Sequence, residues 1–204
     1  MQTTESMKQS TNYSAISRMR YAHQSIGGFT LLELMISIVI LAVLFTFAVP
    51  SFRELMLNNK MTANVNDVIS ALRLARAEAI KRDSFVTVCA SNAAGNNCAT
   101  DDPPIPFHQN GWLVISDTGV AGTMDGTDEL IRSYPPISDE NFTIQYNNGN
   151  FVSFNTLGFV SSVSNGTMSF CDKRGNQTGV PINIVISSAG RVRTEHPTAP
   201  DCES

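Results

Sequence analysis

The sequence predicts an α+β fold in which one long N-terminal α-helix packs on a head of antiparallel β-sheet. Two changes in the pattern of apolar residues lead to this prediction. Residues 29–49 form a nearly continuous apolar run, and between residues 50 and 82 the apolar residues recur at helical intervals. From Phe85 onward apolar and polar residues alternate in short segments, which is the period of a strand. The 204 residues leave room for one modest domain besides the apolar helix.

The apolar run at residues 29–49 is long enough to cross a membrane. At a helical rise of about 1.5 Å per residue it covers roughly 30 Å, the thickness of the hydrocarbon core of a bilayer. The apolar part of a cleaved secretory signal is much shorter and precedes a small-residue cleavage site, and neither feature is found here. We therefore expect this run to stay with the protein as a single membrane-spanning helix.

Glu33 is the single charged residue of this run and lies about one turn inside it. A carboxylate left unpaired at membrane depth costs on the order of 2.5 to 3.5 kcal/mol or more. Its attraction to the positive end of the helix dipole is worth under about 1 kcal/mol, which does not offset that cost. We therefore expect Glu33 to have a cationic partner.

Residues 50–82 are predicted to continue the helix with an amphipathic pattern. Pro50 marks the end of the membrane segment, because its ring and its missing N–H disturb a continuing helix. The apolar positions, which the head is expected to cover, are Val65, Val68, Ile69, Leu72, Ala75, Ala79 and Ile80. The basic residues between them, up to the predicted helix end near Arg82, are interpreted as a solvated helix face rather than a binding site.

The head, residues 83–204 with a C-terminal tail, is predicted to be antiparallel sheet because its segments alternate. The predicted strands are Phe85–Cys89, Trp112–Ile115, Glu129–Tyr134, Phe142–Tyr146, Phe151–Phe154, Met168–Cys171 and Ile182–Ile186. Turns rich in Asn and Gly, such as residues 147–150, separate them, and no helical pattern interrupts them. We expect the sheet to pack on the second half of the long helix.

All four cysteines, Cys89, Cys98, Cys171 and Cys202, lie in the predicted head. Three pairings are possible, and pairing of sequence neighbours is the simplest. Each closed loop would stabilise the head by roughly 2 to 4 kcal/mol in an oxidising compartment. The alternative is a zinc site, but the sequence has no Cys-x-x-Cys pair. We therefore expect disulfides and no metal.

The sequence offers little for catalysis. It has no Gly-x-Ser-x-Gly, His-Glu-x-x-His or phosphate-binding loop, and beyond residue 28 its histidines are His108 and His196. We therefore expect neither enzymatic activity nor a cofactor. Asp125, Asp128 and Glu129 are an alternative calcium site, but their spacing differs from that of an EF-hand loop, and a solvated turn is the simpler interpretation.

The tail carries the strongest candidate binding site. Arg191 and Arg193 stand two residues apart, so in an extended segment they share one face, about 6.5 to 7 Å apart. Guanidinium groups at this interval can grip successive phosphates of a nucleic-acid strand. Val192 would point to the opposite, packed face, and Gly190 permits a tight turn before the pair. The alternative is an arginine pair that only keeps a sheet edge soluble.

The segment Gly28-Phe-Thr-Leu-Leu-Glu33, after a polar leader that contains Arg18 and Arg20, resembles the signal of type IV prepilins and type II secretion pseudopilins. In that family a prepilin peptidase cuts after the glycine and N-methylates the next residue. The resemblance implies a pilin-like fold, removal of residues 1–28 and a methylated Phe29. It also implies that Glu33 attracts the freed amine of a neighbouring subunit during filament assembly.

Further segments extend the resemblance to the FimT and GspH family of minor pilins and pseudopilins. Residues 72–82 resemble the end of that family's helix, and residues 151–159 resemble part of its head. The tail segment Gly190-Arg191-Val192-Arg193 resembles the Gly-Arg-x-Arg motif of the FimT minor pilins, which are implicated in DNA uptake during natural transformation.

This last resemblance implies that Arg191 and Arg193 contact DNA. Charge alone suggests Lys173 and Arg174 as auxiliary contacts. The motif is surrounded by negative charge at Glu195, Asp201 and Glu203, which departs from a purely basic tail. A disulfide between Cys171 and Cys202 would tie the tail to the head and limit the orientations of the arginines, which lowers the entropy cost of binding.

Charge also predicts the orientation and the strength of binding. The leader arginines place the N-terminus in the cytoplasm and the head in the periplasm of a bacterium, with one pass through the inner membrane. Without residues 1–28 the chain has 11 basic and 17 acidic residues, a formal charge of −6. DNA must therefore contact a local basic patch through its backbone, and such binding is weak and sensitive to salt.

Two functions remain open from the sequence. The first is a FimT-like minor pilin that enters a type IV pilus and binds DNA non-specifically for uptake. The second is a GspH-like pseudopilin of the type II secretion system, with a structural role at the tip and no DNA binding. A weaker third possibility is a priming role in pilus assembly without DNA contact. Each has other pilin or pseudopilin subunits, prepilin peptidase and the inner membrane as partners.

Overall fold

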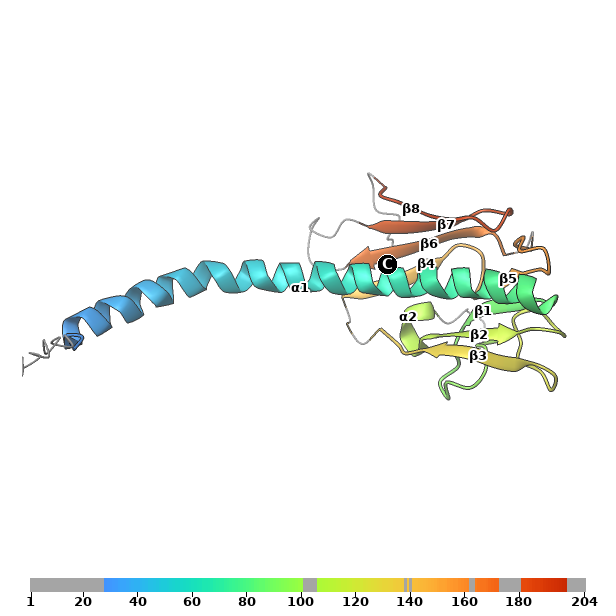
Figure 1. Cartoon of the computed structure of the whole chain (residues 1–204), viewed down its shortest axis with the longest axis horizontal. Helices are drawn as coiled ribbons and strands as arrows, with labels where there is room; N and C mark the ends of the chain where they lie inside the picture. Colours follow the sequence, from blue (N-terminus) through green and yellow to red (C-terminus); the bar gives the residue numbers. More distant parts are fainter. Residues whose placement is uncertain are drawn as a thin grey trace, which may run out of the picture. The chain divides into compact units, whose positions relative to one another are not determined.

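The computed structural model describes residues 28–100, 106–137, 139, 141–161, 164–172 and 181–197. The chain divides into two compact units, one up to Ala48 and one from Val49 onward. Figure 1 shows the elements, which are α1 (Leu31–Arg82), β1 (Val86–Ala90), α2 (Phe107–Asn110), β2 (Trp112–Ser116), β3 (Glu129–Tyr134), β4 (Phe142–Tyr146), β5 (Phe151–Phe154), β6 (Gly166–Asp172), β7 (Ile182–Ile186) and β8 (Val192–Glu195).

The first unit contains residues 31–48 of α1 and the residues before them. Thr30 caps the helix, since its Oγ1 accepts a hydrogen bond from the backbone N–H of Glu33 at 3.1 Å. The apolar side chains of this unit are exposed, with Phe29 at 82% and Leu31 at 77%. Within the described part of the chain, α1 is the one helix that is long and apolar enough to cross a membrane.

The second half of α1 buries one stripe of side chains against the head. The buried residues are Met61, Val65, Val68, Ala71, Leu72, Ala75 and Ala79. Most of the predicted stripe is therefore confirmed, but Ile80 is 52% exposed and was wrongly included. The helix ends at Arg82, as predicted, and Asp83 follows it with a left-handed φ of 51°.

The head contains two antiparallel sheets, in the strand orders β3-β2-β1-β5 and β4-β6-β7-β8. All seven predicted strands are confirmed. The structure adds β8, which pairs with β7 where only a tail was expected. It also adds α2, which corrects the prediction that no helix interrupts the strands. A helix of four residues is too short to produce a helical period in the sequence.

One apolar core joins α1 to both sheets. It contains Val68 and Leu72 of the helix, Trp112 and Phe154 of the first sheet, and Ile184 of the second, all at most 2% exposed. The second half of α1 runs alongside the strands of both sheets (Figure 1). The helix therefore serves as the common support on which loops from either sheet can meet.

The cysteine predictions fall partly within the described residues. Cys89 and Cys98 form a disulfide, as predicted, with their Cα atoms 5.5 Å apart. Cys171 is also disulfide-bonded, and Cys202 lies outside the described residues. The Cys89–Cys98 disulfide ties β1 to the end of the turn that follows it. An isolated β-bridge between Ser91 and Cys98 closes the same turn.

Carboxylates organise the loop between β2 and β3. Asp117 is 2% exposed and accepts hydrogen bonds from Thr87 Oγ1 at 2.7 Å and the Gly122 N–H at 2.8 Å. Asp128 accepts from the backbone N–H groups of Thr118 and Asp125, at 2.8 and 2.9 Å. These carboxylates hold the loop backbone, and the described residues contain no cluster of three potential ligands for a metal.

Burial raises the pKa of Asp117, and this group makes stability depend on pH. A carboxyl whose pKa is raised by folding favours the folded state while it is protonated. That contribution is fully present below the ordinary pKa of about 4 and is lost as the pH rises through the raised pKa. Desolvation opposes ionisation of Asp128, but the hydrogen bonds to its carboxylate outweigh that effect and lower its pKa. The contribution of Asp128 to stability therefore has the opposite pH dependence and is lost as the pH falls through the lowered pKa.

We predict that Asp117→Asn weakens the loss of stability with rising pH. An amide oxygen can accept both hydrogen bonds that Asp117 Oδ2 now accepts, while the buried charge is removed. Urea denaturation of the parent and the variant at pH values from about 4 to about 7 measures this difference. Asp128→Asn is the control and should change the pH dependence in the opposite direction. Parallel stability curves for Asp117→Asn and the parent would contradict the assignment.

Candidate functional site

The Gly-Arg-x-Arg segment lies at the end of a tight hairpin between β7 and β8. The turn is closed by backbone hydrogen bonds from the Gly190 N–H to the Ser187 carbonyl at 2.8 Å and from the Ser187 N–H to the Arg191 carbonyl at 3.0 Å. Ser187 Oγ accepts a further bond from the Arg191 N–H at 3.2 Å. The segment predicted as a tail is therefore a fixed turn, here called the tail hairpin (residues 187–195).

Gly190 is required by the geometry of this turn. Its φ is +71°, in the left-handed region that other residues rarely adopt, and it is buried. A Cβ atom at this position would lie 2.0 Å from the backbone oxygen of Gly158. Gly158 is itself left-handed at φ +75° and belongs to the turn after β5. Two glycine turns from different sheets are thus in direct contact.

Arg76 of α1 lies beneath both turns. Its Nη1 donates a hydrogen bond to the Gly190 carbonyl at 2.9 Å. A Cβ atom on Gly158 would lie 3.0 Å from Arg76 Nε and 2.8 Å from Ile80 Cδ1, so that turn also packs closely on the helix. Arg76 is therefore not part of a solvated helix face, as the sequence suggested, but fixes the position of the tail hairpin.

The two predicted DNA-contacting arginines are exposed on the tail hairpin. Val192 between them is half-buried and packs on the core, as predicted. Arg193 Nη2 forms an ion pair with Glu195 Oε1 at 2.8 Å, with both side chains largely exposed. Arg191 instead lines a groove beside α1. The proposed auxiliary contacts Lys173 and Arg174 lie outside the described residues.

The groove beside Arg191, here called the helix–hairpin groove, has a volume of about 420 Å³. Its lining residues are Leu72, Arg73, Arg76, Ala77, Ile80, Gly190, Arg191 and Val192. Three arginines thus surround an otherwise mainly apolar surface, and no carboxylate is found among the described lining residues. A groove with one sign of charge and apolar walls concentrates the electrostatic field, which favours an anionic ligand.

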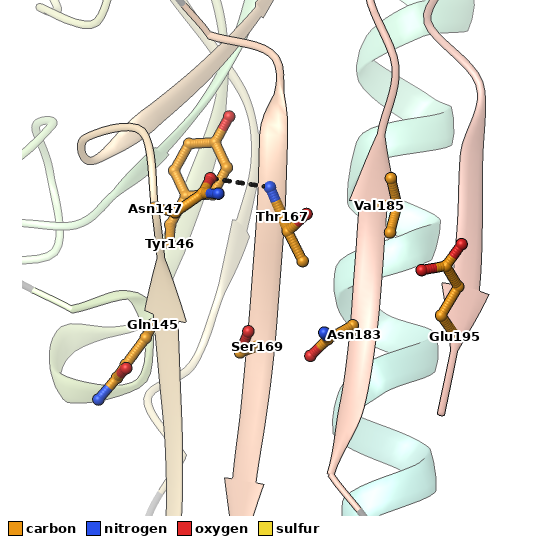
Figure 2. Close-up of a pocket in the computed structure, with 8 residues that line it drawn as sticks. All are labelled: Gln145, Tyr146, Asn147, Thr167, Ser169, Asn183, Val185 and Glu195. Carbon is orange, nitrogen blue, oxygen red and sulfur yellow. Dashed lines mark hydrogen bonds between the residues drawn. The ribbon is translucent and has the colours of Figure 1, made fainter. Parts of the chain in front are cut away.

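A second groove lies on the outer face of the sheet β4-β6-β7-β8 (Figure 2). Gln145, Ser169, Asn183 and Glu195 lie opposite one another on the four strands and form a polar row across the sheet. Asn183 is 8% exposed, and its Oδ1 has no hydrogen-bond partner in the described part of the chain. Among the described residues its lining contains a carboxylate and no cation, so this part of the groove does not suit a phosphate.

The predicted processing and assembly residues lie at the start of α1. Gly28 and Phe29 are exposed and precede the first helical residue, Leu31. Glu33 lies in the first turn of the helix, and its carboxylate has no ion pair with any residue that the structure describes. The described residues thus leave this carboxylate available for a partner.

Arg76 and Gly158 contribute to the candidate site but were not predicted from the sequence. Arg76 stands four residues after Leu72 and four before Ile80, so it interrupts an apolar row on one face of the helix. That position was a signal of a packed arginine, because a guanidinium on such a face must find partners among the elements that cover it. No comparable signal indicated the contact between Gly158 and Gly190, which are distant in the sequence.

Comparisons with known proteins agree with this architecture. Residues 64–190 match the protein family described as Type II transport protein GspH, and residues 24–49 match the prokaryotic N-terminal methylation motif. A crystal structure of the type IV minor pilin FimU from Pseudomonas aeruginosa in space group P21 is similar, with a TM-score of 0.53 and 16% identity over 70% of this chain and 96% of the FimU chain.

A second FimU crystal structure, in space group P65, gives a TM-score of 0.49 at 16% identity over 68% of this chain and 98% of the other. No curated protein matches the sequence. The similarity to the first FimU structure shows the fold, a long N-terminal helix packed on antiparallel sheets.

We predict that Gly190→Ala destabilises the head more than either of two matched substitutions. The left-handed φ alone costs a non-glycine residue roughly 1 to 3 kcal/mol, and the contact with Gly158 adds to that cost. Gly149→Ala isolates the backbone term, since Gly149 has φ +90° with no atom within 4 Å of the added Cβ. Gly126→Ala should leave the stability nearly unchanged, because Gly126 has neither a left-handed φ nor an atom within 4 Å of the added Cβ.

Urea denaturation of the three variants and the parent gives the comparison. The order of stability loss is expected to be Gly190→Ala, then Gly149→Ala, then Gly126→Ala. An equal loss at Gly190 and Gly149 would mean that the contact between the two glycine turns does not constrain the tail hairpin.

Proposed function

Because this chain belongs to the family of the type II transport protein GspH, it is a pilin or pseudopilin subunit, and we propose that it is a minor type IV pilin that binds DNA for uptake. Its apolar N-terminal helix and methylation motif indicate a membrane-anchored subunit that prepilin peptidase processes and that assembles with other pilins. DNA binding through the tail hairpin is the further step of the proposal.

Each segment of the chain has its own role in the proposed pilin subunit. Cleavage after Gly28 removes residues 1–28 and leaves a methylated Phe29 at the N-terminus. Residues 29–49 hold the subunit in the inner membrane, residues 50–82 continue the helix, and residues 83–204 form a periplasmic head. During assembly the Glu33 carboxylate pairs with the amine of Phe29 in a neighbouring subunit, which offsets the cost of burying an unpaired charge.

The single observation that carries DNA binding is the presentation of Arg191 and Arg193 on a fixed hairpin. Both side chains are exposed, while half-buried Val192 packs on the core and the Gly190 carbonyl accepts a hydrogen bond from Arg76. Pre-positioned arginines lose less conformational entropy when they bind phosphates than arginines on a free tail. With about two to four phosphate contacts, binding should be micromolar or weaker, with a salt slope of roughly −2 to −4 on logarithmic axes.

We predict that the double substitution Arg191→Ala and Arg193→Ala abolishes DNA binding and leaves the fold intact. Both side chains are exposed, so their loss removes phosphate contacts without opening the core. The measurement is a salt titration of DNA binding by the detergent-solubilised chain. The double substitution Arg53→Ala and Lys60→Ala is the matched control, since it removes two charges from exposed side chains of α1 that lie outside the groove. If the arginine variant shifts DNA in a gel as well as the parent does, the assignment of DNA binding to Arg191 and Arg193 is wrong.

The match of residues 64–190 to the GspH family favours a second candidate, a structural pseudopilin of the type II secretion system without DNA binding. A strain whose single gene copy encodes the double arginine variant separates the two candidates. The minor-pilin proposal expects loss of transformation with normal protein secretion. A secretion defect on deletion of the gene, with transformation unchanged, would support the pseudopilin instead.

We predict that Glu195→Gln strengthens DNA binding. The substitution removes the carboxylate that pairs with Arg193 at 2.8 Å, so this guanidinium no longer has to exchange an internal partner for a phosphate. An exposed ion pair is worth at most about 1 kcal/mol, which limits the gain in affinity to roughly fivefold. The salt slope should steepen towards one additional contact. Weaker binding by Glu195→Gln would instead mean that the ion pair orients Arg193 for DNA.

A further inference from the structure

We propose that the DNA-binding surface continues from the tail hairpin onto α1, where Arg73 binds a phosphate at the helix–hairpin groove. This inference rests on the proposed DNA binding and adds a contact that lies outside the Gly-Arg-x-Arg segment. It also separates the arginines by role, since Arg73 contacts DNA directly and Arg76 is a positioning residue.

The helical spacing places the α1 residues of the groove on one face. Arg73, Arg76, Ala77 and Ile80 stand at intervals of three, four and seven residues from the first. Side chains three residues apart on a helix have Cβ atoms about 5 to 6 Å apart. Arg191 lines the same groove from the hairpin. One concave surface of about 420 Å³ therefore brings together cations from two segments that are distant in the sequence.

Among the described residues, the lining of this groove is positively charged although the whole chain is acidic. It holds Arg73, Arg76 and Arg191 and no described carboxylate. The nearest acid along the helix, Glu78, forms ion pairs with Lys81 at 3.0 Å and Arg82 at 2.6 Å. Those hydrogen bonds lower the pKa of Glu78, so it stays ionised and occupied by its own cations. A polyanion approaching the groove therefore meets a local surplus of positive charge.

Arg73 and Arg76 differ in what they already bind. Arg73 is exposed, and its side chain makes no hydrogen bond or ion pair within the described ranges. Arg76 is half-buried and donates to the Gly190 carbonyl. Arg73 can therefore reach a phosphate without breaking an internal contact. Arg76 keeps the hairpin against α1 and so holds Arg191 at the same groove as Arg73.

The apolar part of the groove strengthens the interaction between a bound phosphate and the arginines. Leu72 and Val192 lie in its lining, and Ile80 is exposed there. Charges beside an apolar wall are screened less by water than charges on an open surface, so a phosphate bound there interacts more strongly with each guanidinium. The chemistry of the groove thus fits a sugar–phosphate backbone, with its charged groups at the arginines and its sugars against the apolar wall.

The test is a salt titration of DNA binding by the full chain in non-ionic detergent, with a labelled duplex of about 20 base pairs and NaCl from about 50 to about 200 mM. Arg73→Gln is compared with the parent, with the double variant Arg191→Ala and Arg193→Ala, and with Lys60→Gln. Lys60 is the matched control, because it lies on the same helix about 20 Å from Arg73 and removes one charge.

The expected result for Arg73→Gln is a roughly 3- to 10-fold weaker affinity and a salt slope smaller by about 1. Lys60→Gln should change the affinity less than about twofold and keep the parent's slope. Parental affinity and slope in Arg73→Gln, or a loss no greater than that in Lys60→Gln, would overturn this inference. If the double arginine variant then still loses binding, the proposed function stands. If the parent does not bind DNA, the proposed function itself fails.

Discussion

The hydrogen bond from Arg76 to the Gly190 carbonyl is the contact on which the candidate site depends. It joins residues 114 positions apart and connects the central helix to the turn that presents Arg191. The carbonyl belongs to a buried residue, so without Arg76 it would need another donor. Gly158 completes the constraint, because only residues without a Cβ allow the two turns to approach each other and the guanidinium beneath them. The position of the arginine hairpin is thus set by packing rather than by the hairpin alone.

The distribution of charge explains how an acidic chain can offer a site for an anion. Two described carboxylates near the site are already occupied, since Glu78 pairs with two cations of α1 and Glu195 pairs with Arg193. The arginines of the helix–hairpin groove face no carboxylate within its lining. The outer sheet face, where Glu195 lies in a polar row, has the opposite character (Figure 2). The helix–hairpin groove and the outer sheet face therefore differ in the ligands that they favour.

Sequence periodicity predicted the helix end and every strand that has an alternating apolar pattern, because burial on one face imposes that pattern. It did not predict β8, whose Val192 is its single apolar residue, or the four-residue α2. Arg191 and Arg193 were proposed from a short motif, whereas Arg76 was wrongly interpreted as solvated. Its partners come from turns far away in the sequence, and such contacts leave no local pattern. The division of the head into two sheets was likewise not predicted, because it depends on which strands pair, and periodicity does not encode pairing.

The location of Arg73 and Arg76 on α1 has a consequence for binding. A long helix is stiffer than a hairpin, and its side chains start from a backbone that loses almost no freedom when a ligand arrives. The hairpin gains the same advantage only because Arg76 and the paired glycine turns hold it against the helix. Both halves of the helix–hairpin groove are therefore pre-organised by one element, whose buried stripe also supports the core of both sheets. A mutation that loosens the helix–hairpin contact should then impair recognition of an anion even where every exposed arginine is retained.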